Sequence, residues 1–254
     1  MVELSRMSWK EAREAVRQAK VALLPVGSTE QHGPHLPLGT DWMTAQEIAR
    51  RAGKKGGWLV LPTIPVGVSE HHRHFWGTLW VPAEVLRDYV MGVARSLGFH
   101  GLRKMVFVNG HGGNTAALEE AARRLRAEGI YAYVYVWWRA IAETIAQIVE
   151  TGGSHAAEME TAVVLAIAPE LVRPENYGEA VKKGAPEWGK KVEGIDVGFD
   201  TIDFTASGAT GDPSRATVEK GERILQAAAE RLDAFCRWLA SQPEEALAPK
   251  PHLP

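Results

Sequence analysis

The chain has 254 residues, of which 45% are hydrophobic and 24% charged, and its formal net charge is -2. A composition this close to that of an average globular protein excludes an intrinsically disordered chain, and the lack of a basic excess excludes a general nucleic-acid binder. The one cysteine, Cys236, excludes an intramolecular disulfide, and no apolar run approaches the ~20 residues of a membrane span. We therefore expect a soluble, cytoplasmic globular protein without nucleic-acid or membrane partners.

Apolar runs typical of buried strands alternate along the chain with segments of helical composition. In chain order the sequence predicts a strand at 21–26, a helix at 43–52, a strand at 58–62, a helix at 82–97, a strand at 104–109, a helix at 115–128, a strand at 130–137, and helices at 140–150, 156–168 and 213–240. Alternation of this kind predicts βαβ units and a mostly parallel sheet, hence an α/β fold.

Two segments depart from this rhythm. Residues 173–207 are rich in glycine and proline and predict a long irregular excursion, of the kind that is often functional or lies against a partner. The Pro-rich tail at 243–254 predicts a loose C-terminus, so the domain is expected to span residues 1–242. Asp212 and Pro213 are expected to start the last long helix.

The first chemical motif is STEQHGPHLPLGTD, residues 28–41, which follows the first strand. Glu30 and His32 are two residues apart, so in an extended segment they point to the same side. Asp41 can reach them because the intervening glycines and prolines favour a turn. The alternative is a surface loop in which Thr40 or Asp41 caps the next helix, and a bare Glu-x-His pair favours that alternative.

The second motif is VNGHGGN, residues 108–114, which places His111 between glycines after a strand and before a helix. Glycines there allow the backbone to approach an ion closely, although an incidental histidine in a βα turn is the alternative. The third motif is GSHAAEMETA, residues 153–162. If it is helical, His155 and Glu158 share a face and Glu160 points elsewhere, while Ser154 would serve as the N-cap.

The three motifs together supply histidines and carboxylates on loops that follow strands. The carboxyl ends of parallel strands form the ligand crevice of such a sheet. Mixed nitrogen and oxygen ligands suit Zn²⁺, Mn²⁺ or Fe²⁺, and a carboxylate such as that of Asp41 can bridge two ions. A further loop carries His71, His72 and His74, which either handle substrate or lie on a polar surface.

These motifs, in this order, resemble the creatininase (creatinine amidohydrolase) family of metal-dependent amidohydrolases. The resemblance runs through LPVGSTEQHGPHLPLGTD, GVSEHH, VNGHGGN, SHAAEMET and GATGDPSRATVEKG. It implies a single three-layer α/β/α domain, two divalent metal ions and a homohexamer. It also implies hydrolysis of a non-peptide or cyclic amide C–N bond, such as that of creatinine, in a small-molecule substrate.

Carried over position by position, the resemblance implies metal ligands at Glu30, His32, Asp41 and His111, with Asp41 bridging. It implies a role in substrate handling or proton transfer for His155, and substrate contacts at His72, Gly112 and Gly113. The chain departs from creatininase at Gly113, where creatininase has a carboxylate that completes its second metal site. We expect Glu158 to replace that ligand, with Glu160 as the second choice, and we expect creatinine to be a poor substrate. The alternatives are a formamide deformylase acting on a pyrimidine or pterin precursor and a metal-free scaffold protein. The branches of the family that resemble this chain in the glycine loop include such deformylases and a peptidase that trims a modified peptide.

Overall fold

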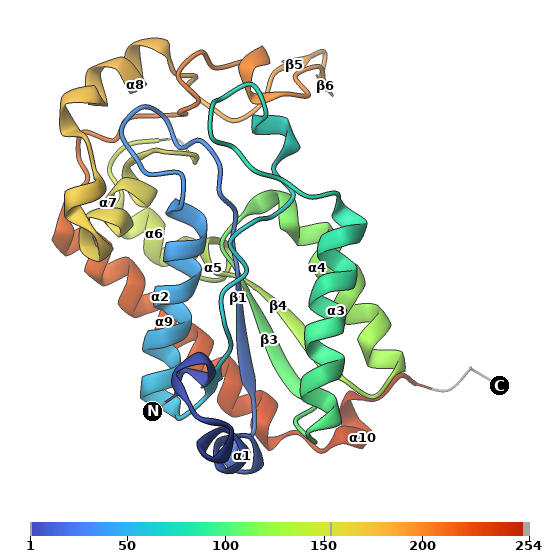
Figure 1. The fold of residues 1–254 in the computed structure, drawn as a ribbon. Helices are drawn as coiled ribbons and strands as arrows, with labels where there is room; N and C mark the ends of the chain where they lie inside the picture. The colour runs from blue at the N-terminus through green and yellow to red at the C-terminus, as the bar shows by residue number, and fades with distance from the viewer. Residues whose placement is uncertain (1, 153, 251–254) are drawn as a thin grey trace.

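The computed structural model describes residues 2–152 and 154–250, and a parallel four-stranded sheet lies at its centre (Figure 1). The strands are β1 (Ala22–Val26), β2 (Leu59–Val60), β3 (Lys104–Asn109) and β4 (Tyr131–Val136), in the order β2-β1-β3-β4. All three pairings are parallel. The predicted strands and the parallel sheet are confirmed, although β2 is only two residues long.

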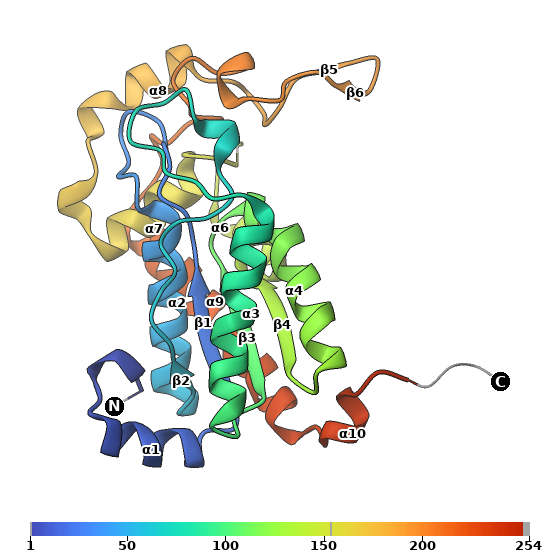
Figure 2. The ribbon, with the colours of Figure 1, turned by 45° about the vertical axis from the view of Figure 1, so that its right-hand side comes forward.

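Helices cover both faces of the sheet, which gives three layers (Figure 2). One face packs against α2 (Thr40–Gly56), α7 (Glu158–Ile167) and α9 (Val218–Ser241), and the other against α3 (Ala83–Phe99) and α4 (Thr115–Ala127). Successive strand residues serve opposite faces: Leu23 packs toward α2 and α9, and Leu24 toward α3 and α4. Each buried aliphatic side chain contributes about 1.5–3 kcal/mol to this packing. The three-layer α/β fold is therefore confirmed.

Some helix boundaries differ from the predicted ones. The last long helix begins at Val218 and not at Pro213, because the Thr217 hydroxyl accepts from the Lys220 amide and caps the helix there. The predicted helix at 140–150 is two short helices, α5 (Trp137–Ala140) and α6 (Ala142–Ile148). Helix α7 begins at Glu158, two residues later than predicted.

The N-terminal segment forms α1 (Trp9–Gln18), which begins with a capping box between Ser8 and Glu11. The excursion at 173–207 is partly regular: it contains α8 (Tyr177–Lys183) and a hairpin of β5 (Lys191–Val192) and β6 (Ile195–Asp196). In both views α8 and the hairpin lie beyond the same end of the sheet, and Figure 2 shows the hairpin projecting outward.

The C-terminal segment is not loose at residues 243–248, contrary to the sequence prediction. It forms α10 (Glu244–Leu247), Leu247 is buried in the core, and Arg126 donates hydrogen bonds to the carbonyls of Leu247 and Ala248. Residues 251–254 of the predicted tail lie outside the described residues. Within the described part of the chain, no helix is both long and apolar enough to cross a membrane.

Candidate metal centre and active site

The predicted ligands meet at the carboxyl ends of β1 and β3. Glu30 and His32 follow β1, His111 follows β3, and Asp41 lies in the first turn of α2, and all four side chains are buried. The β1 loop can lie against the start of α2 because residue 27 is glycine: a Cβ there would come within 2.4 Å of the Trp42 backbone. Asp41 is not a cap, since the N-cap of α2 is Gly39 and no side chain caps the helix.

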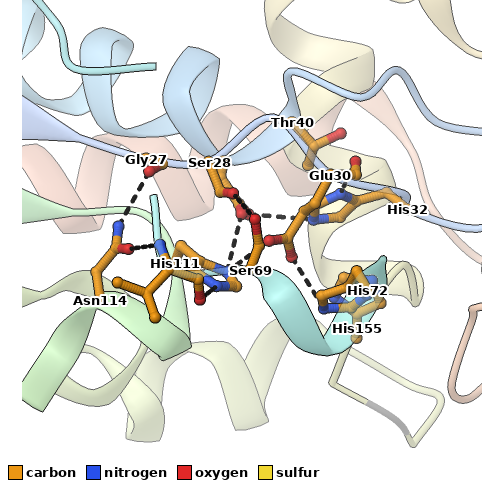
Figure 3. Close-up of polar contacts among 12 residues, drawn as sticks. Gly27, Ser28, Glu30, His32, Thr40, Ser69, His72, His111, Asn114 and His155 are labelled. Carbon is orange, nitrogen blue, oxygen red and sulfur yellow. Dashed lines mark hydrogen bonds and ion pairs between the residues drawn. The ribbon is translucent and has the colours of Figure 1, made fainter. Parts of the chain in front are cut away.

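Asn114 ties the loops after β1, β2 and β3 together (Figure 3). Its side-chain amide donates to the Gly27 carbonyl at 3.0 Å, and its Oδ1 accepts from the Val68 amide at 2.8 Å. Ser28 and Ser69 add a hydrogen bond between the first two loops at 2.8 Å. These side chains therefore fix the relative positions of the loops that carry the candidate ligands.

The buried carboxylates lie directly against histidine nitrogens. Figure 3 shows Glu30 between His72 and His111, at 3.2 Å from His72 Nε2 and 3.1 Å from His111 Nδ1. Asp41 reaches both sides of the cluster: its Oδ1 lies 3.1 Å from His32 Nε2 and its Oδ2 lies 3.2 Å from His111 Nδ1. Asp41 thus has the geometry that a bridging carboxylate requires.

The far side of each ring faces a backbone carbonyl. His111 Nε2 donates to the Val68 carbonyl at 3.0 Å, and His32 Nδ1 donates to the Glu30 carbonyl at 3.2 Å. A histidine that ligates a metal characteristically donates its other ring N–H in this way, which fixes the ring and turns the opposite nitrogen toward the ion. His111 Nδ1 and His32 Nε2 are therefore presented to the carboxylates.

The donor set fits divalent cations. Both carboxylate oxygens of Glu30 and Oδ2 of Asp41 are fully buried and have no hydrogen-bond partner among the described residues. Three groups of three potential ligand atoms lie within 4.8 Å of one another among the described residues. They are Glu30 with Asp41 and His111, His32 with Asp41 and Glu160, and Glu30 with His32 and His155. Buried unpartnered oxygens are costly, and a cation among them would remove that cost.

The electrostatics of the cluster lead to the same conclusion. Burial alone would lower the pKa of His32, but the neighbouring carboxylates, Asp41 foremost, raise it to about 10. Burial raises the pKa of Glu30, and it raises that of Glu160 to about 7. Burial would also raise the pKa of Asp41, but the adjacent His32 and His111 hold it below its usual range. The cluster therefore requires positive charge, supplied either by protons or by metal ions.

Glu160, and not Glu158, faces the cluster, so the sequence expectation for Glu158 is corrected. His155 precedes α7 and does not lie in it, so the helical spacing assumed for residues 155 and 158 does not apply. The Glu158 carboxylate instead accepts from the Thr151 amide at 2.7 Å, from the Glu150 amide at 2.9 Å, and pairs with Lys220. Glu160 Oε2 lies 3.8 Å from His32 Nε2 and accepts from the Ala156 amide at 2.6 Å.

His72 and His155 lie beside the candidate ligands, with their rings stacked at 4.9 Å between centroids. His72 is completely buried, so the surface-loop alternative for this residue is excluded, whereas His74 is exposed near Asp200. His155 Nε2 lies 2.9 Å from the Gln31 carbonyl. Burial lowers the pKa of both His72 and His155, so both rings are neutral.

A cavity of about 710 Å³ opens onto the cluster. Its inner wall includes Glu30, Asp41, His155 and the glycines Gly112 and Gly113, and its outer wall includes the aromatic residues Trp138, Trp188, Phe199 and Phe204 together with Arg139. Trp188 belongs to the excursion after α8, and its ring lies 5.2 Å from that of His155. No motif in the sequence marks Trp188 as a site residue, and only the irregular composition around it departs from the rest of the chain.

The family model described as "Creatininase: Creatinine amidohydrolase" matches residues 5–236. The chain belongs to the creatininase family. The mycofactocin precursor peptide peptidase of Mycobacterium ulcerans is 37% identical over 229 residues, which cover 85% of this chain and 84% of that protein. The creatinine amidohydrolase of Pseudomonas putida is 29% identical over 246 residues, covering 89% and 92%. A solved structure described as "Creatininase Mn" has a TM-score of 0.79 and 26% identity and covers 95% of this chain and 99% of that one.

Membership of the creatininase family makes the chain a hydrolase of amidohydrolase type. The relatives that it resembles include one named for a peptide and one named for creatinine, so the family alone does not identify the substrate. The finer assignment depends on the residues of this cavity.

Gly113 of this creatininase-family chain has a structural reason to be glycine. A Cβ at residue 113 would lie 2.2 Å from the Val68 carbonyl oxygen and 2.6 Å from His111 Nε2, the two atoms of the hydrogen bond that orients His111. A Cβ at Gly112 meets nothing within 4 Å. The absence of a side chain at residue 113 therefore preserves the orientation of His111.

We expect Gly113→Ala to lower metal affinity about 10- to 100-fold, the usual effect of disturbing an outer-shell partner of a ligand. Gly112→Ala is the matched control and should bind metal as the wild type does. Titration of both variants with Zn²⁺ by calorimetry checks this expectation. Equal affinities for the two variants would show that the Val68 hydrogen bond does not orient His111 for a metal.

Proposed function

We propose that this protein is a metal-dependent hydrolase that cleaves an amide C–N bond of a substrate bound in the 710 Å³ cavity. The observation that carries the proposal is the group of buried carboxylate oxygens without hydrogen-bond partners, which face histidine nitrogens whose opposite sides donate to carbonyls. A scaffold protein that keeps the fold without ions would have to balance these carboxylates with protons held on the buried His32 and His111.

Two divalent ions, Zn²⁺, Mn²⁺ or Fe²⁺, would be held by two sets of residues that share Asp41. Glu30, Asp41 and His111 form the first set, and His32, Asp41 and Glu160 form the second. Mixed carboxylate and imidazole ligands suit these metals. The similar creatininase structure described as a manganese form supports the proposal.

Ions bound there would lower the pKa of a water molecule and polarise the amide carbonyl. The residues of the chain supply the remaining requirements. His155 Nε2 is engaged with Gln31, so Nδ1 is the nitrogen with which His155 can take up a proton and return it to the leaving nitrogen. Trp188 and Phe204 line the cavity with ring centroids 5.1 Å apart and offer apolar surface to the substrate.

The substrate is proposed to be a non-peptide or cyclic amide, with a peptide amide as the second candidate. The second candidate is favoured by the volume of the cavity, by its aromatic outer wall and by the resemblance to a peptide peptidase. Arg139, at the exposed end of the cavity, is a cation that an extended substrate with a carboxylate could reach. A formamide deformylase would use the same ligands.

We expect creatinine to be hydrolysed at least about 10- to 100-fold more slowly than the preferred amide. Gly113 offers no carboxylate to a cyclic guanidine-like substrate, and an unpaired polar group in a closed site costs about 1–3 kcal/mol. The test loads metal-free protein with Mn²⁺, Zn²⁺ or Fe²⁺ and compares creatinine, cyclic amides, formamides and short peptides in steady-state assays. Creatinine as the fastest substrate would refute the expectation, and protein that binds no stoichiometric metal would refute the proposed function.

We also propose that the protein is a cytoplasmic homo-oligomer, a hexamer by family resemblance, that acts on its small-molecule substrate without nucleic-acid or membrane partners. The family resemblance supports this proposal, and two large apolar side chains lie open on the surface of the described chain. Trp76 is 99% exposed and Phe99 is 88% exposed. Light scattering on the purified protein tests this proposal, and a monomer at micromolar concentration would contradict it.

A further inference from the structure

Gln31 lies between two candidate metal ligands in the sequence, yet its side chain points away from them. Its neighbours Glu30 and His32 face the carboxylate cluster, whereas the Gln31 amide lies among His72, His155 and Gly208 and is buried. The function proposed above assigns no role to this side chain, although it touches both histidines that lie beside the ligands.

The orientation of the Gln31 amide is determined by two backbone groups. The Gly33 N–H can only donate, and it lies 2.9 Å from Gln31 Oε1. The Gly208 carbonyl can only accept, and it lies 3.2 Å from Gln31 Nε2. Rotating the amide by 180° would place a donor against the Gly33 N–H and an acceptor against the Gly208 carbonyl, so Nε2 must face Gly208.

Gly208 is suited to this contact. Its φ is 81°, in the left-handed region that favours glycine, and a Cβ there would lie 1.8 Å from Gln31 Oε1. The excursion thus returns to the site through a residue whose lack of a side chain allows the backbone to reach the Gln31 amide.

With the amide oriented in this way, one Gln31 N–H remains for the histidines. The shortest contact is with His72 Nδ1 at 2.7 Å, so this nitrogen accepts and carries no proton. An imidazole whose Nδ1 accepts a hydrogen bond carries its proton on Nε2, and this nitrogen lies 3.2 Å from Glu30 Oε1. His155 completes the arrangement by donating from Nε2 to the Gln31 carbonyl at 2.9 Å.

We infer that Gln31 is a positioning residue that holds His72 as an Nε2–H donor at the edge of the metal cluster. An Nε2 that carries a proton cannot ligate a metal, so His72 stays outside the ligand set although it is buried beside Glu30. Its Nε2 has no hydrogen-bond partner among the described residues, so the N–H is available to the oxygen of a substrate bound in the cavity. The inference deepens the proposed function and rests on it for the role of that N–H in catalysis.

The test reads the protonated nitrogen of His72 directly. Long-range ¹H–¹⁵N correlation spectra distinguish the two neutral forms of imidazole, and the ¹⁵N-labelled full chain is loaded with Zn²⁺, which is diamagnetic. The His72 signals are identified by their loss in His72→Gln. We expect His72 in the wild type to carry its proton on Nε2. Thr201→Val removes the other contact to His72 Nδ1, at 3.1 Å, and should leave the proton on Nε2 because Gln31 still donates.

Gln31→Glu places an acceptor opposite His72 Nδ1 and should move the proton to that nitrogen. Gln31→Met, of similar size, removes the donor and should also populate the form of His72 with the proton on Nδ1, since the Thr201 hydroxyl can then accept from that nitrogen. This second variant replaces Gln31→Glu as the test if Gln31→Glu does not fold. We further expect Gln31→Glu to lower kcat about 100-fold, as removal of one oriented donor does. A proton on Nδ1 in the wild type, or on Nε2 in both Gln31 variants, would overturn the inference. Because the spectra need no substrate, failure of the proposed hydrolysis would be recognised separately.

Discussion

Asp41→Ala is expected to lose both metal ions, whereas His32→Ala and His111→Ala each lose one. The reason is geometric, because Asp41 offers one oxygen at 3.1 Å from His32 Nε2 and the other at 3.2 Å from His111 Nδ1 and so belongs to both ligand sets. Metal content measured by mass spectrometry after gel filtration checks the expectation. Loss of the ions should lower hydrolysis about a thousandfold or more, since metal polarisation contributes several kcal/mol to the transition state.

Asp233→Ala is the matched control for Asp41→Ala. Asp233 is also a buried helical aspartate, but it accepts from Trp58 Nε1 at 2.8 Å and pairs with Arg237, remote from the cluster. We expect Asp233→Ala to lower the free energy of unfolding by about 1–3 kcal/mol and to keep two ions per chain. Two ions in Asp41→Ala would show that this carboxylate does not bridge.

Helices and strands could be predicted from the sequence where the residue preferences of a segment agree with the way that the segment packs in the fold. β3 has the predicted bounds, because the run KMVFVN is buried on both faces of a parallel sheet and its residues are mostly apolar. The start of α9 was missed because Pro213 suits a first helical turn, and only the structure shows that the hydroxyl of Thr217 caps the helix instead. Both Pro213 and Thr217 suit the start of a helix, so residue preferences alone cannot decide where α9 begins.

The candidate site could be predicted as far as its ligands follow strands directly. Glu30, His32, Asp41 and His111 come together because β1 and β3 are neighbours in the sheet, a pairing that the sequence did not predict. Trp188 and Thr201 come from an excursion that returns to the site more than 100 residues after His72, and no local pattern encodes such a return. Gln31 was missed because its role depends on His72, His155 and Gly208, which lie far from it in the chain.

The position of the third carboxylate depended on where α7 begins. Counting helical turns from His155 selects Glu158, but the helix begins only at Glu158, after Ala156 with a φ of 53°. The left-handed residue turns the chain between His155 and the helix, so the spacing of three residues no longer places the two side chains on one face. Glu160 reaches the cluster from the first turn of α7 instead.

We therefore expect Glu160→Gln to lose one of two metal ions and Glu158→Gln to keep both. Glu160 belongs to the ligand group with His32 and Asp41, whereas Glu158 is fully buried against Lys220, Glu150 and Thr151. Removing the Glu158 charge leaves the Lys220 ammonium without this buried partner, which should lower the free energy of unfolding by about 2–3 kcal/mol. The two substitutions should thus have different effects. Glu160→Gln should change the metal content, and Glu158→Gln should change the free energy of unfolding. Metal analysis and urea denaturation of both variants provide the measurement, and loss of an ion in Glu158→Gln with two ions kept in Glu160→Gln would return the ligand role to Glu158.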